Sequence, residues 1–284
     1  MNSSTRFLVF GFTLLLCATS VSANKSTALR VGDIVFEDKQ FMYCVYKHAN
    51  KTVPVRDVRV LNCEEEFIKS AAGVEHFSNL EELILNRNQI TKLDVSANTK
   101  LKVLKVSNNG LSELDISSNT ELVSLWAVSN RLRHLNTYSN TALTDLYIFY
   151  NQISELDLHT NTALLDLHVS ENKLTALDLY ANTAIRTVDA GYNQLTALDI
   201  SSNTSLSRLM VGGNQITSLD VSTHSLSTLI VSDNQLTTIK IKDAEKFQTL
   251  VVSNNPYNDE TQAYLVELFT NLVPERGPYT VFMY

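Results

Sequence analysis

The stretch Leu80-Glu81-Glu82-Leu83-Ile84-Leu85-Asn86-Arg87-Asn88-Gln89-Ile90 decides the fold, because its frame of residues returns along most of the chain. Leu stands at the first, fourth and sixth positions of the frame, and Asn stands at the ninth. The Asn recurs at positions 88, 109, 130, 151, 172, 193, 214, 234 and 255. The interval is 21 residues at every step except the one from 214 to 234, which is 20. A fixed period of this length predicts a solenoid in which each unit forms one coil.

A second, similar frame lies inside each unit, and it first runs from Ile90 through Leu93 and Val95 to Asn98. Its Asn returns at positions 119, 140, 161, 182 and 203. The repeat resembles the leucine-rich repeat family, in the short bacterial form in which both halves carry the motif. The resemblance covers residues 80–255 and implies a leucine-rich repeat solenoid. We expect a right-handed coil with a parallel β-sheet on one face and mostly β and turns on the other.

The frame has a physical reason. One coil cannot bury its Leu stripe alone, so neighbouring coils must stack and share an interior. The Asn amide is expected to bond backbone groups of its own coil and of the next, which would otherwise be buried and unpaired. The shortened step, where His224 replaces an Asn, is expected to be the main geometric defect.

The first residues have the pattern of a secretion signal, with Arg6, an apolar run over residues 7–17, and small residues that end at Ala23. The apolar run is too short to cross about 30 Å of hydrocarbon, so no membrane span is expected. Lipid attachment at Cys17 is the alternative. We expect an exported protein that is secreted, periplasmic or on the cell surface.

The chain then divides into a signal peptide (1–23), an N-terminal cap with a degenerate first repeat (24–79), nine repeats (80–255) and a C-terminal cap (256–284). The N-terminal cap resembles that of internalin-like proteins, and its apolar positions are Leu61, Cys63, Ile68, Val74, Phe77 and Leu80. A C-terminal helix is expected to be capped by Asn258 or Asp259. Its apolar face would hold Ala263, Leu265, Leu268, Phe269 and Leu272. Residues 279–284 would add an extended edge.

Two cysteines, Cys44 and Cys63, follow the signal. In an exported chain such a pair indicates a disulfide bond, with two buried thiols as the alternative.

Function is expected at the outward positions of the strands, which the frame leaves free. Aromatic residues gather there on adjacent coils, and the only Trp is among them. The candidate binding residues are Trp126, Tyr147, Phe149, Tyr150, His168 and Tyr192. The patch is either a platform for a ligand or a ladder of rings that stack on one another.

Carboxylates recur in the second frame, at positions 94, 115, 157, 178, 199 and 220. Stacked like charges repel, so either a cation such as calcium or hydrogen bonds must compensate them. Hydrogen bonding is the simpler interpretation, and no metal or cofactor is expected.

The functional hypothesis is a non-enzymatic recognition module that binds an extracellular protein or a glycan through the aromatic strand face. A structural or assembly protein of the cell envelope is the alternative. The formal charge of −7 argues against nucleic acid as a partner. No catalytic residues are expected, because the six His are scattered without a metal-ligand spacing or a positioned partner.

Overall fold

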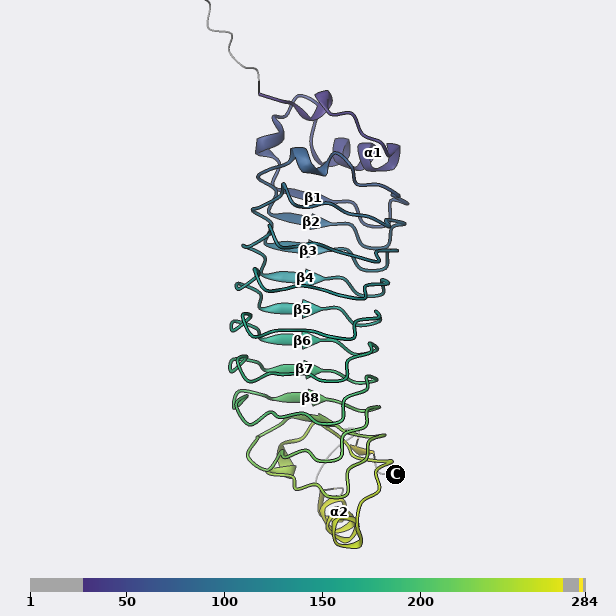
Figure 1. Cartoon of the computed structure of the whole chain (residues 1–284), viewed down its shortest axis with the longest axis vertical. Helices are drawn as coiled ribbons and strands as arrows, with labels where there is room; N and C mark the ends of the chain where they lie inside the picture. The colour runs from purple at the N-terminus through teal and green to yellow at the C-terminus, as the bar shows by residue number, and fades with distance from the viewer. Residues whose placement is uncertain (1–27, 273–280, 283–284) are drawn as a thin grey trace, which may run out of the picture.

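The computed structural model describes residues 28–272 and 281–282, and it is an elongated stack of coils with one helix at each end (Figure 1). The expected signal peptide, including Cys17 and Ala23, lies outside these residues. The strands form a single sheet of eleven strands, in which every strand pairs in parallel with the next one along the chain. This order confirms the predicted leucine-rich repeat solenoid. Its back half consists of turns, with one isolated bridge, Val221 to Ile241, among the residues described.

The strands are three residues long, apart from the last. They are β1 (Val60–Asn62), β2 (Glu82–Ile84), β3 (Val103–Lys105), β4 (Ser124–Trp126), β5 (Asp145–Tyr147), β6 (Asp166–His168), β7 (Thr187–Asp189), β8 (Arg208–Met210), β9 (Thr228–Ile230), β10 (Thr249–Val251) and β11 (Val281–Phe282). The helices are α1 (Lys39–His48) and α2 (Asp259–Leu272), with short 3-10 turns at Val31–Asp33, Val55–Asp57, Val74–His76 and Ala244–Lys246.

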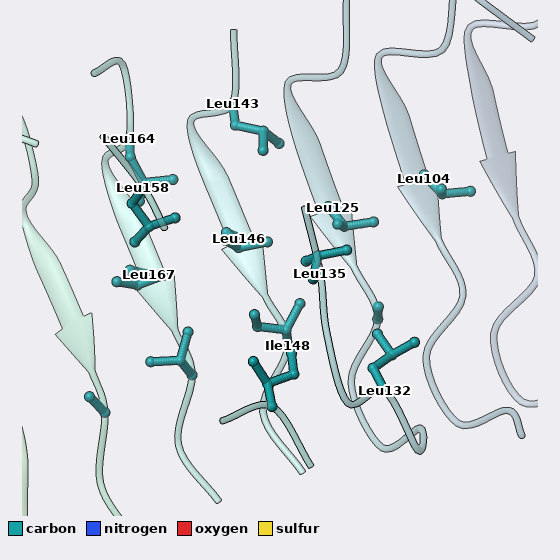
Figure 2. Packing of buried hydrophobic residues seen from close by; sticks show 14 of the residues in the cluster. Leu104, Leu125, Leu132, Leu135, Leu143, Leu146, Ile148, Leu158, Leu164 and Leu167 are labelled. Carbon is teal, nitrogen blue, oxygen red and sulfur yellow. The ribbon is translucent and has the colours of Figure 1, made fainter. Parts of the chain in front are cut away.

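The Leu positions of the frame fill the interior. Leu80, Leu83 and Leu85 are fully buried, and so are their equivalents in the following coils. Figure 2 shows equivalent side chains on successive strands beside residues of the back half: Leu104, Leu125, Leu146, Leu167, Leu135 and Leu158. Apolar burial of roughly 1.5 to 3 kcal/mol per side chain makes this shared interior the main stabilising contribution.

The first-frame Asn residues form a hydrogen-bonded ladder, the front ladder, beside the sheet. Asn151 is typical: its Oδ1 accepts from the backbone N–H of Leu132 at 3.0 Å. Its Nδ2 donates to the carbonyl oxygens of Ala127 at 2.9 Å and Ile148 at 3.0 Å. The amide therefore joins its own coil to the preceding one, whereas the sequence had suggested the following one.

The second-frame Asn residues form the back ladder, which is fully buried. Nδ2 of Asn140 donates to the carbonyls of Ile116 at 3.0 Å and Asn119 at 2.9 Å, again on the preceding coil. At the shortened step His224 takes the place of Asn, and its Nε2 lies 3.1 Å from the carbonyl of Ile200. The ladder thus continues through the expected defect, because an imidazole nitrogen reaches the same kind of carbonyl.

The N-terminal cap closes the first coil, whose apolar positions are buried as predicted. Helix α1 was not expected. It buries Phe41, Cys44 and Val45, and Cys44 forms a disulfide with Cys63, just after β1. The cap therefore lies over the otherwise open first coil and is covalently attached to it.

Asp38 fixes the start of α1. One carboxylate oxygen accepts from the backbone N–H groups of Gln40 at 2.7 Å and Phe41 at 3.2 Å. The other accepts from Lys69 at 2.7 Å and Ser70 at 3.2 Å, in the first coil. Partial burial raises the pKa of Asp38, but these four donors outweigh it and the pKa is lowered.

The C-terminal cap is α2, with Asn258 as its N-cap: its Oδ1 accepts from the backbone N–H of Thr261 at 2.8 Å. Leu265 and Phe269 are buried as predicted, and Leu268 packs against the core. Ala263 is exposed, so its predicted place on the apolar face is wrong. The buried stripe runs through Thr261 instead, because positions four apart lie on one face of a helix.

Beyond α2, Val281 and Phe282 pair with Leu250 and Val251 and add the expected strand edge, while the side chain of Leu272 lies outside the described set. Across residues 28–272 and 281–282, neither helix is long and apolar enough to span a bilayer.

Candidate binding site on the strand face

Each strand from β1 to β10 turns its middle residue inward, which is Leu in all but β7, where it is Val188, so the residue after it points outward on the strand face. Strand pairing then sets Lys105, Trp126, Tyr147, His168 and Asp189 side by side, one from each of β3 to β7. All five are partly exposed. We call these five residues the strand-face stack.

The rings of the stack lie face to face. The centroids of Trp126 and Tyr147 are 4.1 Å apart with 19° between the ring planes. Those of Tyr147 and His168 are 4.6 Å apart at 10°. Lys105 Nζ covers the other face of Trp126 at 5.2 Å from its centroid. Nδ1 of His168 lies 3.6 Å from Oδ2 of Asp189 at the far end.

The stack therefore presents mainly ring edges to solvent, because both faces of Trp126 and Tyr147 and one face of His168 are covered by neighbours. Trp126 is anchored further by its Nε1, which donates to Ser124 Oγ at 3.0 Å. Ser170 Oγ donates to Asp189 Oδ2 at 3.1 Å. The rings are held in one arrangement, and stacking contributes about 0.5 to 1.5 kcal/mol per pair.

Charged groups flank the stack at the first positions of β5, β6 and β8. Asp145 and Asp166 are direct neighbours in the sheet, and Arg208 lies 3.5 Å from Asp166 and donates to Thr187 Oγ1. Desolvation, then the charges of Asp166 and Asp145, raise the pKa of Tyr147. The phenol therefore stays protonated at neutral pH and lies in a negative environment.

The remaining predicted site residues lie beside the stack and do not extend it. Phe149 packs against Tyr150, with centroids 5.7 Å apart and planes at 60°. Tyr150 and Tyr192 sit in left-handed turn conformations, with φ of 56° and 52°, and both are exposed. Tyr192 lies against Gly213 in the next coil, where an added Cβ would come within 2.6 Å of its ring.

Sequence reasoning missed the two ends of the stack, Lys105 and Asp189, and the flanking Asp145, Asp166 and Arg208. The signal was available: Lys105 and Asp189 share the frame position of Trp126, and Asp145, Asp166 and Arg208 share the outward position two residues earlier. The aromatic pattern alone does not point to these charged residues.

The recurring carboxylates of the second frame serve the turns. Oδ1 of Asp115 accepts from the backbone N–H of Ser117 at 2.9 Å, and this bond, together with one from the Ser117 side chain, lowers its pKa. Asp199 and Ser201 repeat the arrangement at 2.9 Å. Hydrogen bonding thus compensates the carboxylates, as the simpler interpretation held. Within the described part of the chain, no three His, Cys, Asp or Glu side chains form a metal-binding group.

Comparison with known proteins gives structural matches only. No family model and no curated protein matches the chain. The functional domain of InlJ from Listeria monocytogenes, a domain with a cysteine ladder, is 33% identical with a TM-score of 0.74. The match covers 79% of this chain and 52% of that domain, so the chain spans about half the length of the InlJ domain.

Two further structures share the fold at lower identity. The internalin InlF from Listeria monocytogenes is 22% identical with a TM-score of 0.63, over 91% of this chain and 92% of that one. The ectodomain of the Arabidopsis thaliana receptor kinase GASSHO1/SCHENGEN3, solved with Casparian strip integrity factor 2, is 21% identical with a TM-score of 0.63. That match covers 72% of this chain and 28% of the ectodomain.

The repeat, the parallel sheet and the two caps define a leucine-rich repeat solenoid. With the likeness to the InlJ domain, the chain is an internalin-like leucine-rich repeat protein. Solenoids of this class build extended surfaces for binding and are typically not enzymes.

Proposed function

We propose that the protein is an exported recognition module that binds an extracellular protein through the strand-face stack. The observation that carries the proposal is the run of three stacked rings on β4, β5 and β6, which is fixed in place between Lys105 and Asp189 and partly exposed. Trp and Tyr are the residue types that most often anchor protein interfaces, and fixing their rings before binding reduces the entropic cost of association. The Cys44–Cys63 disulfide supports an oxidising compartment.

The stack favours a protein over a glycan as the ligand of this face. A sugar ring binds an aromatic side chain by lying on its face, and both faces of Trp126 and Tyr147 and one face of His168 are already covered. Ring edges and the indole and phenol groups remain, and these suit the mixed surface of a protein loop. The GASSHO1/SCHENGEN3 ectodomain, solved with Casparian strip integrity factor 2, offers a precedent for a ligand on the same fold.

The charges beside the stack indicate which part of a partner would lie there. Asp145 and Asp166 are adjacent, and only Asp166 has Arg208 nearby among the described residues. A Lys or Arg side chain of the partner would relieve the repulsion between the two carboxylates while its apolar stem packs along Tyr147. We therefore expect a basic side chain at the centre of the bound surface.

The test is capture of protein from envelope and host-surface extracts by wild type, Trp126→Ala and Tyr147→Ala. Recognition predicts that one band is lost with both variants while the melting temperature stays within a few degrees, since the rings lie outside the core. Tyr43→Ala, an exposed aromatic in the N-terminal cap, is the matched control and should retain the band. Equal capture by all four proteins would contradict the proposal.

The structural alternative rests on the same rings, because a stack can also serve stability or contact between copies. It predicts that Trp126→Ala and Tyr147→Ala lower the melting temperature markedly or abolish self-association in sedimentation experiments. The same two variants thus separate the classes.

A further inference from the structure

A second row of rings lies on the opposite half of the solenoid, at the turns that follow the recurring carboxylates. It consists of Tyr138, His159 and Tyr180, one from each of three consecutive coils. Four other coils carry Ser at the same position, namely Ser96, Ser117, Ser201 and Ser222. We call the three residues the back-turn row. Tyr138 is 61% exposed and Tyr180 is 76% exposed, which is far more open than the rings of the strand-face stack.

The back-turn row is held by its backbone. The N–H groups of Tyr138, His159 and Tyr180 donate to side-chain oxygens two residues earlier, at 3.0, 3.0 and 2.9 Å. The acceptors are Asn136, Asp157 and Asp178. The three residues therefore follow the repeat, and with coils about 4.8 Å apart the two Tyr are about 10 Å from one another.

The rings of this row are splayed, which leaves ring faces open. The planes of Tyr138 and His159 are at 56° with centroids 5.6 Å apart, in contrast to 19° for Trp126 and Tyr147. His159 Nδ1 lies 2.7 Å from Asp157 Oδ1, which fixes the imidazole. Tyr180 is the most exposed ring of the row.

Polar groups surround a shallow hollow between two of these turns. Its volume is about 200 Å³, and its lining includes Tyr138, His159, Asn136, Asp157 and Thr160. Asn136 Nδ2 offers a donor, and Asp157 and Thr160 offer acceptor oxygens, since the Thr160 hydroxyl already donates to the carbonyl of Tyr138 at 2.9 Å. An open aromatic face beside such groups is suited to a sugar ring, which has an apolar face and a rim of hydroxyls.

We propose that the back-turn row is a carbohydrate-binding site for an uncharged glycan. Tyr138 and Tyr180 provide faces for two sugar rings of one extended chain, and the groups around the hollow bond their hydroxyls. The glycan is uncharged because carboxylates recur along the same edge and would repel acidic sugars. A glycan is favoured over a protein partner here, because the rings are tilted and leave faces open, whereas Trp126 and Tyr147 on the strand face are covered on both sides. This site does not depend on the strand-face stack.

Calorimetric titration tests the site with four probes: β-1,4-linked hexamers of glucose and of N-acetylglucosamine, a β-1,4-mannan hexamer, and a hexamer of galacturonate as the acidic probe. The full protein should bind at least one uncharged hexamer and should not bind galacturonate. Affinity should fall about tenfold or more in Tyr180→Ala and in Tyr138→Ala, because each removes a ring face. Tyr180→Phe should bind like wild type, since it keeps the face.

Ser201→Ala, at the same frame position in another coil, and Trp126→Ala, on the strand face, are the controls and should bind the hexamer like wild type. The proposal is overturned if no uncharged hexamer binds, if galacturonate binds more tightly, or if Tyr180→Ala and Tyr138→Ala bind like wild type. Loss of a protein partner from Tyr180→Ala, with hexamer binding unchanged, also overturns it. Failure here leaves the Trp126 and Tyr147 results untouched, so the two proposals are tested separately.

Discussion

Thr137 Oγ1 lies 2.8 Å from Oδ1 of Asn161, one coil further along the back ladder. The equivalent amide oxygens of Asn98, Asn119, Asn140, Asn182 and Asn203 are buried and have no partner among the described residues. Thr137 occupies a frame position that holds Val, Ile or Leu in other coils. A single hydroxyl therefore satisfies one acceptor of a ladder that is otherwise left with its oxygens unpaired.

Val95→Thr is expected to be tolerated, because position 95 is equivalent to that of Thr137. The new hydroxyl could donate to Oδ1 of Asn119, as Thr137 donates to Oδ1 of Asn161. Val221→Thr is the matched control, since His224 rather than Asn follows it and no ladder Asn faces it from the next coil. In urea unfolding we expect Val95→Thr to change stability by less than about 1 kcal/mol and Val221→Thr to cost about 1 to 3 kcal/mol. Equal losses would show that the ladder oxygens need no donor.

The two Asn ladders should differ in their contribution to stability. Asn151→Ala removes one acceptor and one donor group and leaves the backbone N–H of Leu132 without its acceptor. We therefore expect the free energy of unfolding to fall by about 2 to 3 kcal/mol. Asn140→Ala removes two donated bonds but also removes an unpaired oxygen. Its loss of unfolding free energy should therefore be about 1 kcal/mol smaller than that of Asn151→Ala. Chemical denaturation of both variants measures the difference. A larger loss for Asn140→Ala would reverse the ranking of the ladders.

The pH dependence of stability should report on Asp38. Its pKa is lower in the folded protein, so its contribution is present above the pKa of the unfolded chain and is lost as the pH falls through the folded value. Unfolding free energy followed from pH 6 downward should decline in wild type and decline less steeply in Asp38→Asn. Asp57→Asn, in the same cap, should follow wild type. Parallel curves for Asp38→Asn and wild type would exclude this role.

The ionisation of Tyr147 can be followed through Trp126, because the two rings are stacked and Trp126 is the only Trp of the chain. Desolvation, Asp166 and Asp145 raise the pKa of Tyr147, so quenching of Trp126 by tyrosinate should begin above the ordinary tyrosine value of about 10. Asp166→Asn should lower the midpoint, whereas Asp57→Asn should not. An unchanged midpoint in Asp166→Asn would show that the carboxylate does not act on the ring.

Most of the fold could be predicted because the repeat makes each coil a copy of the others. The apolar positions of Leu80, Leu83 and Leu85 recur in every coil and mark the strand and the residues on either side of it. The structure places β2 to β10 at these positions. Helix α1 could not be found in this way. Its position depends on contacts far away in sequence, from Asp38 to Lys69 and from Cys44 to Cys63.

The aromatic members of the strand-face stack could be predicted from the sequence, but its charged members and its geometry could not. The period places Trp126, Tyr147 and His168 on adjacent strands, but whether the rings stack or splay depends on rotamers and on the charged residues beside them. The back-turn row could not be predicted for a different reason: its aromatic residues stand where the second frame usually has Ser, beside a recurring carboxylate that is the stronger pattern of that half.

The most direct test of the strand-face account is Trp126 emission during titration with the captured partner. Trp126 lies within the stack, so the account predicts a spectral change that saturates with the partner, and an affinity about tenfold or more weaker for Tyr147→Ala. Saturable binding of the partner with unchanged Trp126 emission and undiminished affinity in Tyr147→Ala would contradict it.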